Sequence, residues 1–343
     1  MAENKLNSCG TVGIVVIGRN EASRLPAALD SAGAVHAARV IYVDSGSTDG
    51  SVVVARERGI EVLSLDACQP FSAARARREG AQRLLSQAPD IRYLHFLDGD
   101  SELHKGWVSE AIDFLESSPE IALVCGMLTE RDPNGSVYNK LAALQWDAPV
   151  GEIDHCGGIF LVRTDAYLAA GGFKAELLTG EERDLCARIR AQGYRLVRLD
   201  RPMAEHDLGF YSFRQWWTRR VWGGHGYALE QEQLPEERGR RRGVPSRMFW
   251  GVAVPAASLV GLVATLFALW AIVVPILGVL LYLVLMMRIA LPRIRAGETP
   301  RDAALYGFFC AVQKIAVASG FVAHKLGGRP RPDAHAATEA PQR

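Results

Sequence analysis

Short apolar runs rich in β-branched residues alternate with amphipathic segments from residue 11 to residue 126. The runs have the length and composition of buried strands, and they cover residues 11–17, 39–44, 61–65, 93–98 and 121–126. Between them, helical patterns cover residues 21–32, 50–58, 72–86 and 107–117. One more strand is predicted at 194–199. Strands that alternate with helices in this way predict an α/β fold with a mostly parallel sheet, which we place within residues 1–210.

A second pattern begins after residue 247, where a long apolar stretch runs without a charge from Phe249 to Met287. A membrane is crossed by about 20 residues of helix, so this stretch is too long for one span. We therefore predict two transmembrane helices within 248–290, joined near Leu269–Pro275. The alternative is a buried core helix pair of a soluble protein.

Basic residues flank both outer ends of this hairpin, which places both ends in the cytoplasm under the positive-inside rule. These residues are Arg238, Arg240, Arg241, Arg242, Arg247, Arg288, Arg293, Arg295 and Arg301. Residues 211–247 predict an aromatic and basic amphipathic helix at the membrane surface, followed by a basic linker. Residues 291–327 predict either an interfacial helix or a third span, because Gln313 and Lys314 interrupt the apolar pattern.

Composition narrows the choice of partners and of compartment. The net charge of +1 gives no reason to expect nucleic-acid binding. The six cysteines form no CxxC pair, which favours reduced thiols in a cytosolic domain over a disulfide framework or a zinc site. The first ten residues lack the pattern of a signal peptide, and the Pro-rich residues 328–343 predict a disordered tail.

Acidic residues stand at the ends of two predicted strands. Asp44 ends one strand, and Asp98 ends another and is followed by Gly99 and Asp100. An Asp-Gly pair is typical of a turn, but ligands of parallel sheets bind at the carboxyl ends of the strands. Two carboxylates there suit Mg²⁺ or Mn²⁺ completed by phosphate oxygens. The first strand is followed by GRNEASRL and not by G-x-G-x-x-G, which argues against a nicotinamide dehydrogenase.

Four segments, taken in order, resemble the family 2 glycosyltransferases, whose nucleotide-binding domain has the GT-A fold. They are VVIGRNEASRL, VIYVDSGSTDGS, FSAARARREG and HFLDGD, and the resemblance extends from Val12 to about Tyr227. It implies a nucleotide-sugar donor and a divalent cation. The implied donor-binding residues are Asn20, Glu21, Asp44, Ser47, Arg77 and Asp98. Arg78 stands where the family usually has asparagine.

The resemblance also implies metal ligands and a catalytic base. Asp98 and Asp100 match the family's D-x-D motif, and His206 stands just past the strand at 194–199, where some enzymes of similar fold supply a third ligand. Glu182 takes the position at which the family usually has an aspartate base, with Asp184 as the fallback. A structural account of Glu182 is also open, because residues 179–182 (TGEE) fit a capping box.

Acceptor-side residues are expected in two places. CGGIFLVRTDAYLAAGGF contains Gly157 and Gly158 and resembles the family's acceptor segment. Arg219 and Arg220 lie in FYSFRQWWTRRVWGGHGYALEQ, where they can face phosphates. That segment lacks the Q-x-x-R-W motif of processive polysaccharide synthases, which disfavours a polymerase.

The combined expectation is a membrane-bound inverting glycosyltransferase of the inner (cytoplasmic) membrane, with its catalytic domain in the cytoplasm. It would transfer a sugar from a UDP-linked or related donor to a lipid-linked or glycan acceptor, in cell-envelope polysaccharide or glycolipid synthesis. One alternative is a polyprenyl-phosphate glycosyltransferase, whose anionic acceptor needs no base. Another is a catalytically inactive, membrane-tethered sugar-nucleotide-binding protein.

Overall fold

The computed structural model describes residues 12–36, 38–146, 149–233 and 243–328. The chain forms two compact units, of which the first contains Met1–Gly135 and Gln145–Leu208 and the second Ser136–Leu144 and Gly209–Arg343. The expectations for the N-terminal residues, for the basic linker around residues 238–242 and for the tail lie outside the described residues.

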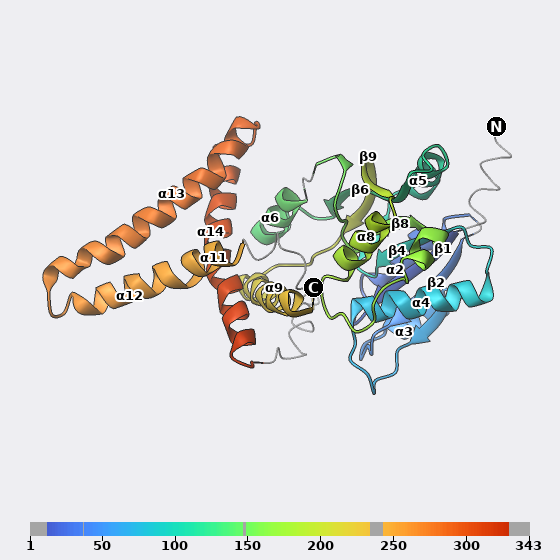
Figure 1. The fold of residues 1–343 in the computed structure, drawn as a ribbon, viewed down its shortest axis with the longest axis horizontal. Helices are drawn as coiled ribbons and strands as arrows, with labels where there is room; N and C mark the ends of the chain where they lie inside the picture. Colours follow the sequence, from blue (N-terminus) through green and yellow to red (C-terminus); the bar gives the residue numbers. More distant parts are fainter. Residues whose placement is uncertain (1–11, 37, 147–148, 234–242, 329–343) are drawn as a thin grey trace. The chain divides into compact units, whose positions relative to one another are not determined.

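The first unit is built on one mixed sheet of nine strands within the described residues, in the order β3-β2-β1-β4-β8-β6-β9-β5, with β7 beside β9 (Figure 1). The strands are β1 (Val12–Gly18), β2 (Arg39–Asp44), β3 (Glu61–Ser64), β4 (Tyr93–Asp98), β5 (Ser101–Leu103), β6 (Ile121–Glu130), β7 (Gly151–Glu152), β8 (Phe160–Arg163) and β9 (Arg195–His206). Strands β1 to β4 are parallel, whereas β8 enters antiparallel between β4 and β6.

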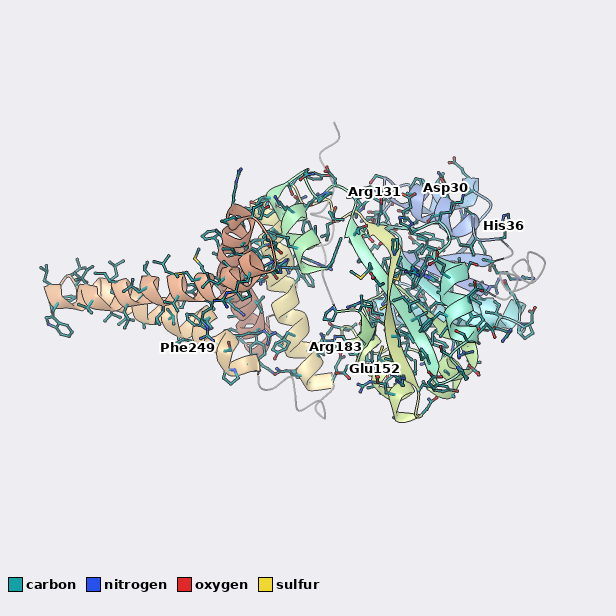
Figure 2. The ribbon with its side chains drawn as sticks, turned by 90° about the horizontal axis from the view of Figure 1, so that it is seen from above. Asp30, His36, Arg131, Glu152, Arg183 and Phe249 are labelled. Carbon is teal, nitrogen blue, oxygen red and sulfur yellow. The ribbon has the colours of Figure 1, made fainter. Side chains whose placement is uncertain are left out.

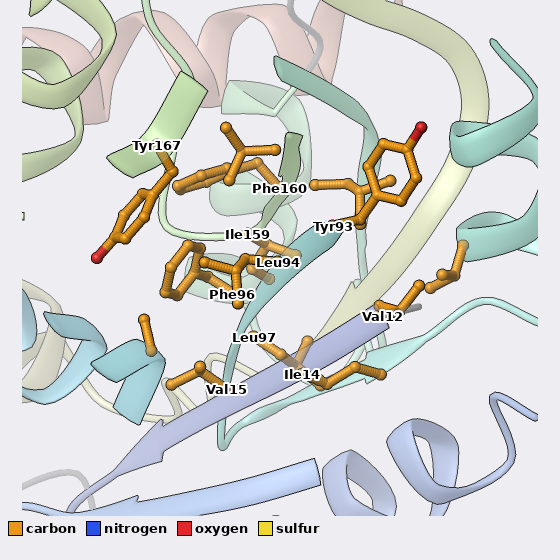
Figure 3. Close-up of a cluster of buried hydrophobic side chains, with 14 of the residues drawn as sticks. Val12, Ile14, Val15, Tyr93, Leu94, Phe96, Leu97, Ile159, Phe160 and Tyr167 are labelled. Carbon is orange, nitrogen blue, oxygen red and sulfur yellow. The ribbon is translucent and has the colours of Figure 1, made fainter. Parts of the chain in front are cut away.

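The core lies on both faces of the central strands, as their continuous apolar runs predict. Ile14, Val15 and Val16 in β1 are all fully buried. Figure 3 shows the apolar side chains of β1, β4 and β8 packed together. Phe96 anchors this cluster, because its ring lies 5.1 Å from that of Phe160 in a tilted arrangement that aromatic pairs favour.

Four helices of the first unit follow the strands they were predicted to follow: α2 (Leu25–Gly33), α3 (Ser51–Glu57), α4 (Ala73–Gln87) and α5 (Trp107–Glu116). The unit also contains α7 (Thr164–Ala169) and α8 (Glu181–Ala191). Helix α2 begins at Leu25 and not at Glu21, because Asn20 adopts a left-handed backbone (φ 58°) and residues 22–24 form a turn. Helix α4 begins where the Ser72 hydroxyl accepts a hydrogen bond from the Arg75 amide at 3.1 Å.

Two expectations for the sheet need correction. Strand β9 continues to His206, so this histidine is the last residue of the strand and does not lie past it. The antiparallel strands β5 and β8 were not predicted, because each is too short to give a periodic signal of its own. The α/β class is confirmed.

The second unit is helical in the described residues. It contains α6 (Val137–Gln145), α9 (Phe213–Gln233), α11 (Gly243–Met248), the π-helical turn η1 (Phe249–Ala253), α12 (Val254–Ala264), the 3₁₀ turn η2 (Leu269–Ile272), α13 (Val273–Arg295) and α14 (Pro300–Lys325). Helix α6 is tied to the start of α9, because the Asn139 amide oxygen accepts a hydrogen bond from the Phe210 backbone at 3.1 Å. Its Tyr138 ring lies 6.2 Å from Trp216 and 5.7 Å from Phe309.

Three helical segments are long and apolar enough to cross a membrane, judged by length and composition: Gly243–Ala264, Leu269–Arg295 and Pro300–Lys325. Helices α12 and α13 form an antiparallel pair (Figure 1). Their connection covers residues 265–272, including the turn η2, and overlaps the predicted joint near Leu269–Pro275. Large apolar side chains point outward along this pair (Figure 2), and Val260, Val279 and Leu280 are all more than half exposed.

Helices α9 and α14 run side by side and in the same direction, with glycines at the points of closest approach. Trp216 packs on Phe309 at 5.0 Å near one end of the pair, and Glu232 binds Lys325 at 2.6 Å near the other. A Cβ atom on Gly224 would collide with the Val317 carbonyl oxygen, and one on Gly320 with that of Val221. The two backbones are therefore nearly in contact.

Candidate active site

Parallel strands bring the predicted donor-side residues to one edge of the sheet. Gly18 at the end of β1 pairs with Asp44 at the end of β2, and the neighbouring Ile17 pairs with Asp98 at the end of β4. Asn20 follows directly after β1. The carboxyl ends of these strands are where an open parallel sheet binds its ligands.

The loops after β1 and β2 are joined by hydrogen bonds among these residues. The Asn20 amide N–H donates to the Ser47 hydroxyl at 2.9 Å, and the Asn20 side-chain oxygen accepts from the Thr48 amide at 2.8 Å. One carboxylate oxygen of Asp44 accepts from the amides of Gly46 and Ser47, both at 3.1 Å. Asp44 is 3% exposed, so the carboxylate chiefly shapes its own loop, and its predicted contact with a nucleotide base stays a prediction.

Arg77 lies at the centre of a buried group of charges. Its guanidinium donates from Nη2 to Asp98 at 3.0 Å, and from Nη1 to Glu181 at 2.9 Å and to Glu182 at 3.0 Å. Burial disfavours the charged form of Arg77, but the three carboxylates outweigh this effect and raise its pKa above the ordinary value. Arg77 therefore joins the end of β4 to the start of α8.

The carboxylate of Glu182 faces this guanidinium and does not cap its own helix. The N-cap residue of helix α8 is Gly180, whose φ is 75° and which has no side chain to cap the first turn. Thr179 is therefore not the N-cap that the capping-box alternative requires. Burial raises the pKa of Glu182 to about 7, with a further contribution from the charge of Glu181, although Arg77 acts in the opposite direction. A carboxylate with such a pKa can accept a proton near neutral pH.

Asp184 takes no part in this group. One of its carboxylate oxygens binds the Lys174 ammonium at 2.8 Å, and the other binds Arg188 Nε at 2.8 Å. Both oxygens are thus occupied by ion pairs, one with Lys174 before α8 and one with Arg188, a turn further along α8 itself. This arrangement suits a structural residue better than the fallback base.

The three predicted metal ligands divide into a pair and a single residue. Strands β5 and β9 bring Asp100 Oδ2 to 3.3 Å from His206 Nε2, whereas Asp98 is turned toward Arg77. Among the described residues, no group of three or more His, Cys, Asp or Glu side chains could hold a metal ion. Mg²⁺ in proteins is often held by one or two carboxylates, with substrate phosphates and water supplying the rest. Asp100 supplies one such carboxylate, and His206 places an imidazole nitrogen beside it.

A largely buried ion pair, Glu21–Arg24, lies near these aspartates. Burial raises the pKa of Glu21 to about 8, and the negative charges of Asp100 and Asp98 add to this effect, while Arg24 opposes it. Arg24 binds the Glu21 carboxylate at 2.6 Å. The ring of Trp146 lies 5.1 Å from that of His206, edge to face, and limits how the imidazole can turn.

The predicted acceptor-side residues fall in different units. Gly158 lies directly against the Arg77–Asp98 ion pair, because a Cβ atom there would collide with Arg77 Nη2 and approach Asp98 Oδ2 at 2.9 Å, whereas Gly157 has open space. Arg219 and Arg220 belong to α9 in the second unit. Arg219 is exposed, and the Arg220 guanidinium lies over the ring of Trp216 at 5.8 Å.

Two family models match the chain. The model for "Glycosyl transferase family 2" covers residues 13–165, and the model for "Glycosyl transferase family group 2" covers residues 93–291. This chain belongs to the family 2 glycosyltransferases.

Two curated relatives from Mycobacterium tuberculosis are similar to this chain, one from strain CDC 1551 / Oshkosh and one from strain ATCC 25618 / H37Rv. Both are named pre-mycofactocin glycosyltransferase. Each is 28% identical to this chain over 242 residues, which is 66% of this chain and 48% of the relative. The chain thus spans about half the length of the curated relatives it matches.

A solved glycosyltransferase has a similar fold. The mannosyltransferase PcManGT from Pyrobaculum calidifontis, determined with GDP-Man and Mn²⁺, matches with a TM-score of 0.54 at 16% identity. The match covers 93% of this chain and 88% of that one. It supports the GT-A fold for this glycosyltransferase.

Sequence reasoning missed Glu181 as a member of the site. This glutamate is 7% exposed and binds the same Arg77 nitrogen as Glu182. The sequence of helix α4 does indicate that Arg77 is buried, because Arg77 lies on the same helical face as the apolar or small residues Gly80, Ala81 and Leu84. An arginine in a buried stripe requires carboxylate partners, and the adjacent glutamates 181 and 182 were available.

Proposed function

We propose that this glycosyltransferase moves one sugar from a nucleotide-diphosphate donor to an acceptor hydroxyl with inversion of the anomeric carbon. The observation that carries the proposal is the Arg77 group, which joins a carboxylate of raised pKa, Glu182, to Asp98 at the nucleotide edge of the sheet. A proton acceptor beside a donor site is what a single-displacement transfer needs.

In this mechanism, Glu182 takes the proton from the acceptor hydroxyl. The acceptor oxygen forms a bond to the anomeric carbon as the bond from that carbon to the donor's diphosphate oxygen breaks, and the nucleoside diphosphate leaves with the electron pair. A positioned general base typically contributes about 10²–10⁴-fold to the rate. Asp98, Asn20 and Ser47 are proposed to hold the nucleotide side of the donor.

A divalent cation, Mg²⁺ or Mn²⁺, would be held by Asp100 and His206, with Asp98 nearby. When bound, such an ion supplies charge that stabilises a leaving diphosphate. The position of Asp100 beside His206 supports this assignment.

The acceptor is proposed to be lipid-linked or a glycan, reached at the cytoplasmic face of the membrane. Three helices of suitable length and hydropathy support membrane attachment. Arginines beside the apolar segments, among them Arg247, Arg293 and Arg295, support a cytoplasmic location of the flanks. Arg219 and Arg220 are candidates for contacts with acceptor phosphates, and a role in envelope polysaccharide or glycolipid synthesis would follow from such an acceptor.

The first experiment is a calorimetric titration of the detergent-purified protein with UDP, in Mn²⁺ and then in EDTA. We expect binding that depends on Mn²⁺ and that is lost in Asp100→Ala but kept in the matched surface variant Asp113→Ala. Binding of GDP in place of UDP would change only the donor class. Absence of metal-dependent binding for every nucleotide diphosphate would contradict the proposed function.

A second experiment separates the proposed enzyme from an inactive sugar-nucleotide-binding protein. Turnover of the donor in the presence of membrane lipid extract should be lost in Glu182→Gln and kept in the exposed control Glu57→Gln. Full activity of Glu182→Gln would instead indicate an anionic acceptor, such as polyprenyl phosphate, which needs no base.

A further inference from the structure

The guanidinium of Arg77 is buried and hydrogen-bonded to three carboxylates of the protein, which is unusual for a residue that binds a donor. Its side chain is 3% exposed, and both terminal nitrogens donate to carboxylates. The remaining nitrogen, Nε, is buried and has no partner among the described residues. Nη1 donates both of its hydrogens to Glu181 and Glu182, and Nη2 donates one to Asp98. The second hydrogen of Nη2 and that of Nε are not bound to these carboxylates, but they belong to a side chain that is only 3% exposed, which leaves a ligand little access to them.

The surroundings of Arg77 keep its side chain in one place. The guanidinium lies 5.7 Å from the centre of the Phe173 ring. Gly158 lies so close to Nη2 that no larger residue fits there without displacing it. The side chain is therefore confined by packing as well as by its hydrogen bonds.

The three carboxylates come from two elements that are far apart in the sequence. Asp98 ends β4, whereas Glu181 and Glu182 begin α8. A guanidinium is planar and presents its donors at fixed angles, so groups bound to its two terminal nitrogens are held at a fixed separation. A lysine ammonium has no such planar fork.

We propose that Arg77 is a positioning residue that sets the distance and direction between Glu182 and Asp98, with Glu181 as its anchor, and that it does not bind the donor itself. The inference rests on the proposed function, in which Glu182 acts on the acceptor and Asp98 lies on the donor side. Arg77 then fixes the acceptor-side base relative to the donor.

The test compares Arg77→Lys with wild type for donor binding and turnover. Because a misplacement of about 1 Å can cost on the order of 100-fold in rate, we expect kcat to fall by roughly that factor. The KM for the donor and the calorimetric Kd for the nucleotide with Mn²⁺ should change far less than kcat, because Asn20, Ser47 and the Asp100–His206 pair, which are also proposed to hold the donor and its cation, make no contact with Arg77. Arg78→Lys is the matched control, since the neighbouring arginine donates to the Phe173 carbonyl at 3.0 Å and not to the three carboxylates that Arg77 binds.

A double-mutant cycle identifies the route of the effect. If Arg77 acts through Glu182, Arg77→Lys should cost little further rate in a Glu182→Gln background, because effects of residues that act as a unit are not additive. Glu181→Gln offers a second variant that keeps a neutral acceptor for Arg77, and it should lower kcat with the donor KM unchanged.

Three results would overturn the inference. The first is a rise in the donor Kd of Arg77→Lys as large as its loss of kcat, and the second is additive effects in the double-mutant cycle. The third is a kcat equal to that of wild type in both Glu181→Gln and Arg77→Lys. Each of these requires an active wild-type enzyme. Failure of the wild type to turn over any donor would instead count against the proposed function.

Discussion

At the scale of single residues, Glu182 makes the pH dependence of the reaction predictable. In the proposed mechanism the ionised carboxylate accepts the proton, and its pKa is raised to about 7, so kcat/KM should fall about tenfold per pH unit below that value and level off above it. Measured rates from about pH 5 to pH 8 at saturating metal test this, and a flat profile would rule out Glu182 as the base.

The same raised pKa makes the folding stability decrease as the pH rises, whereas the rate increases. Because burial raises the pKa of Glu182 from 4.5 to about 7, its neutral form favours the folded state. That contribution is fully present below the unfolded pKa and is lost as the pH rises through the folded one. An enzyme that needs Glu182 ionised therefore works where this residue stabilises the fold least.

Adjacent glycines offer a second prediction at this scale. Gly158→Ala should displace Arg77 or Asp98 and lower activity by at least about tenfold, because its Cβ atom would overlap the ion pair. Gly157→Ala meets nothing within 4 Å and should retain activity. Steady-state rates of the two variants, with thermal unfolding to verify folding, decide the matter. Equal activity would show that the ion pair has room to move.

At the scale of elements, the helices and strands that have a periodic signal were predictable. The strands at 39–44 and 93–98 have the bounds of β2 and β4, because their β-branched and aromatic runs end at acidic residues. The contact between Asp100 and His206 was only implied by family resemblance, because it depends on the pairing of β5 with β9. Such pairing is set by tertiary structure, which no local pattern encodes.

Helices α9 and α14 provide a prediction about packing. Gly224→Ala should destabilise this helix pair, since the added methyl group would meet the Val317 carbonyl. Gly223→Ala is the matched control, because nothing lies within 4 Å of its Cβ position and alanine favours a helix by about 1 kcal/mol over glycine. Thermal unfolding in detergent should show a lower Tm for Gly224→Ala and an equal or higher one for Gly223→Ala. The reverse order would contradict the close approach.

At the scale of the whole molecule, the apolar pair α12–α13 predicts how the chain behaves in a membrane. Leu280→Arg places a charge near the middle of the segment Leu269–Arg295, which costs about 2.5–3.5 kcal/mol in membrane insertion. Phe267→Arg changes the exposed connection between the helices and should cost far less. Extraction of membranes with alkaline carbonate should release more of the first variant than of the second. Equal retention would argue against a spanning hairpin.

The order of the two units along the chain limits how they can be separated. Residues 136–144 lie within the first unit in sequence but belong to the second in space. Their helix is held there by Phe210, Trp216 and Phe309. A chain shortened after Leu208 would keep α6 and lose every one of these partners, leaving apolar surface that favours aggregation. The second unit is thus not an appendage that a single cut removes, and a recombination event would have to exchange two separate pieces of gene to replace it.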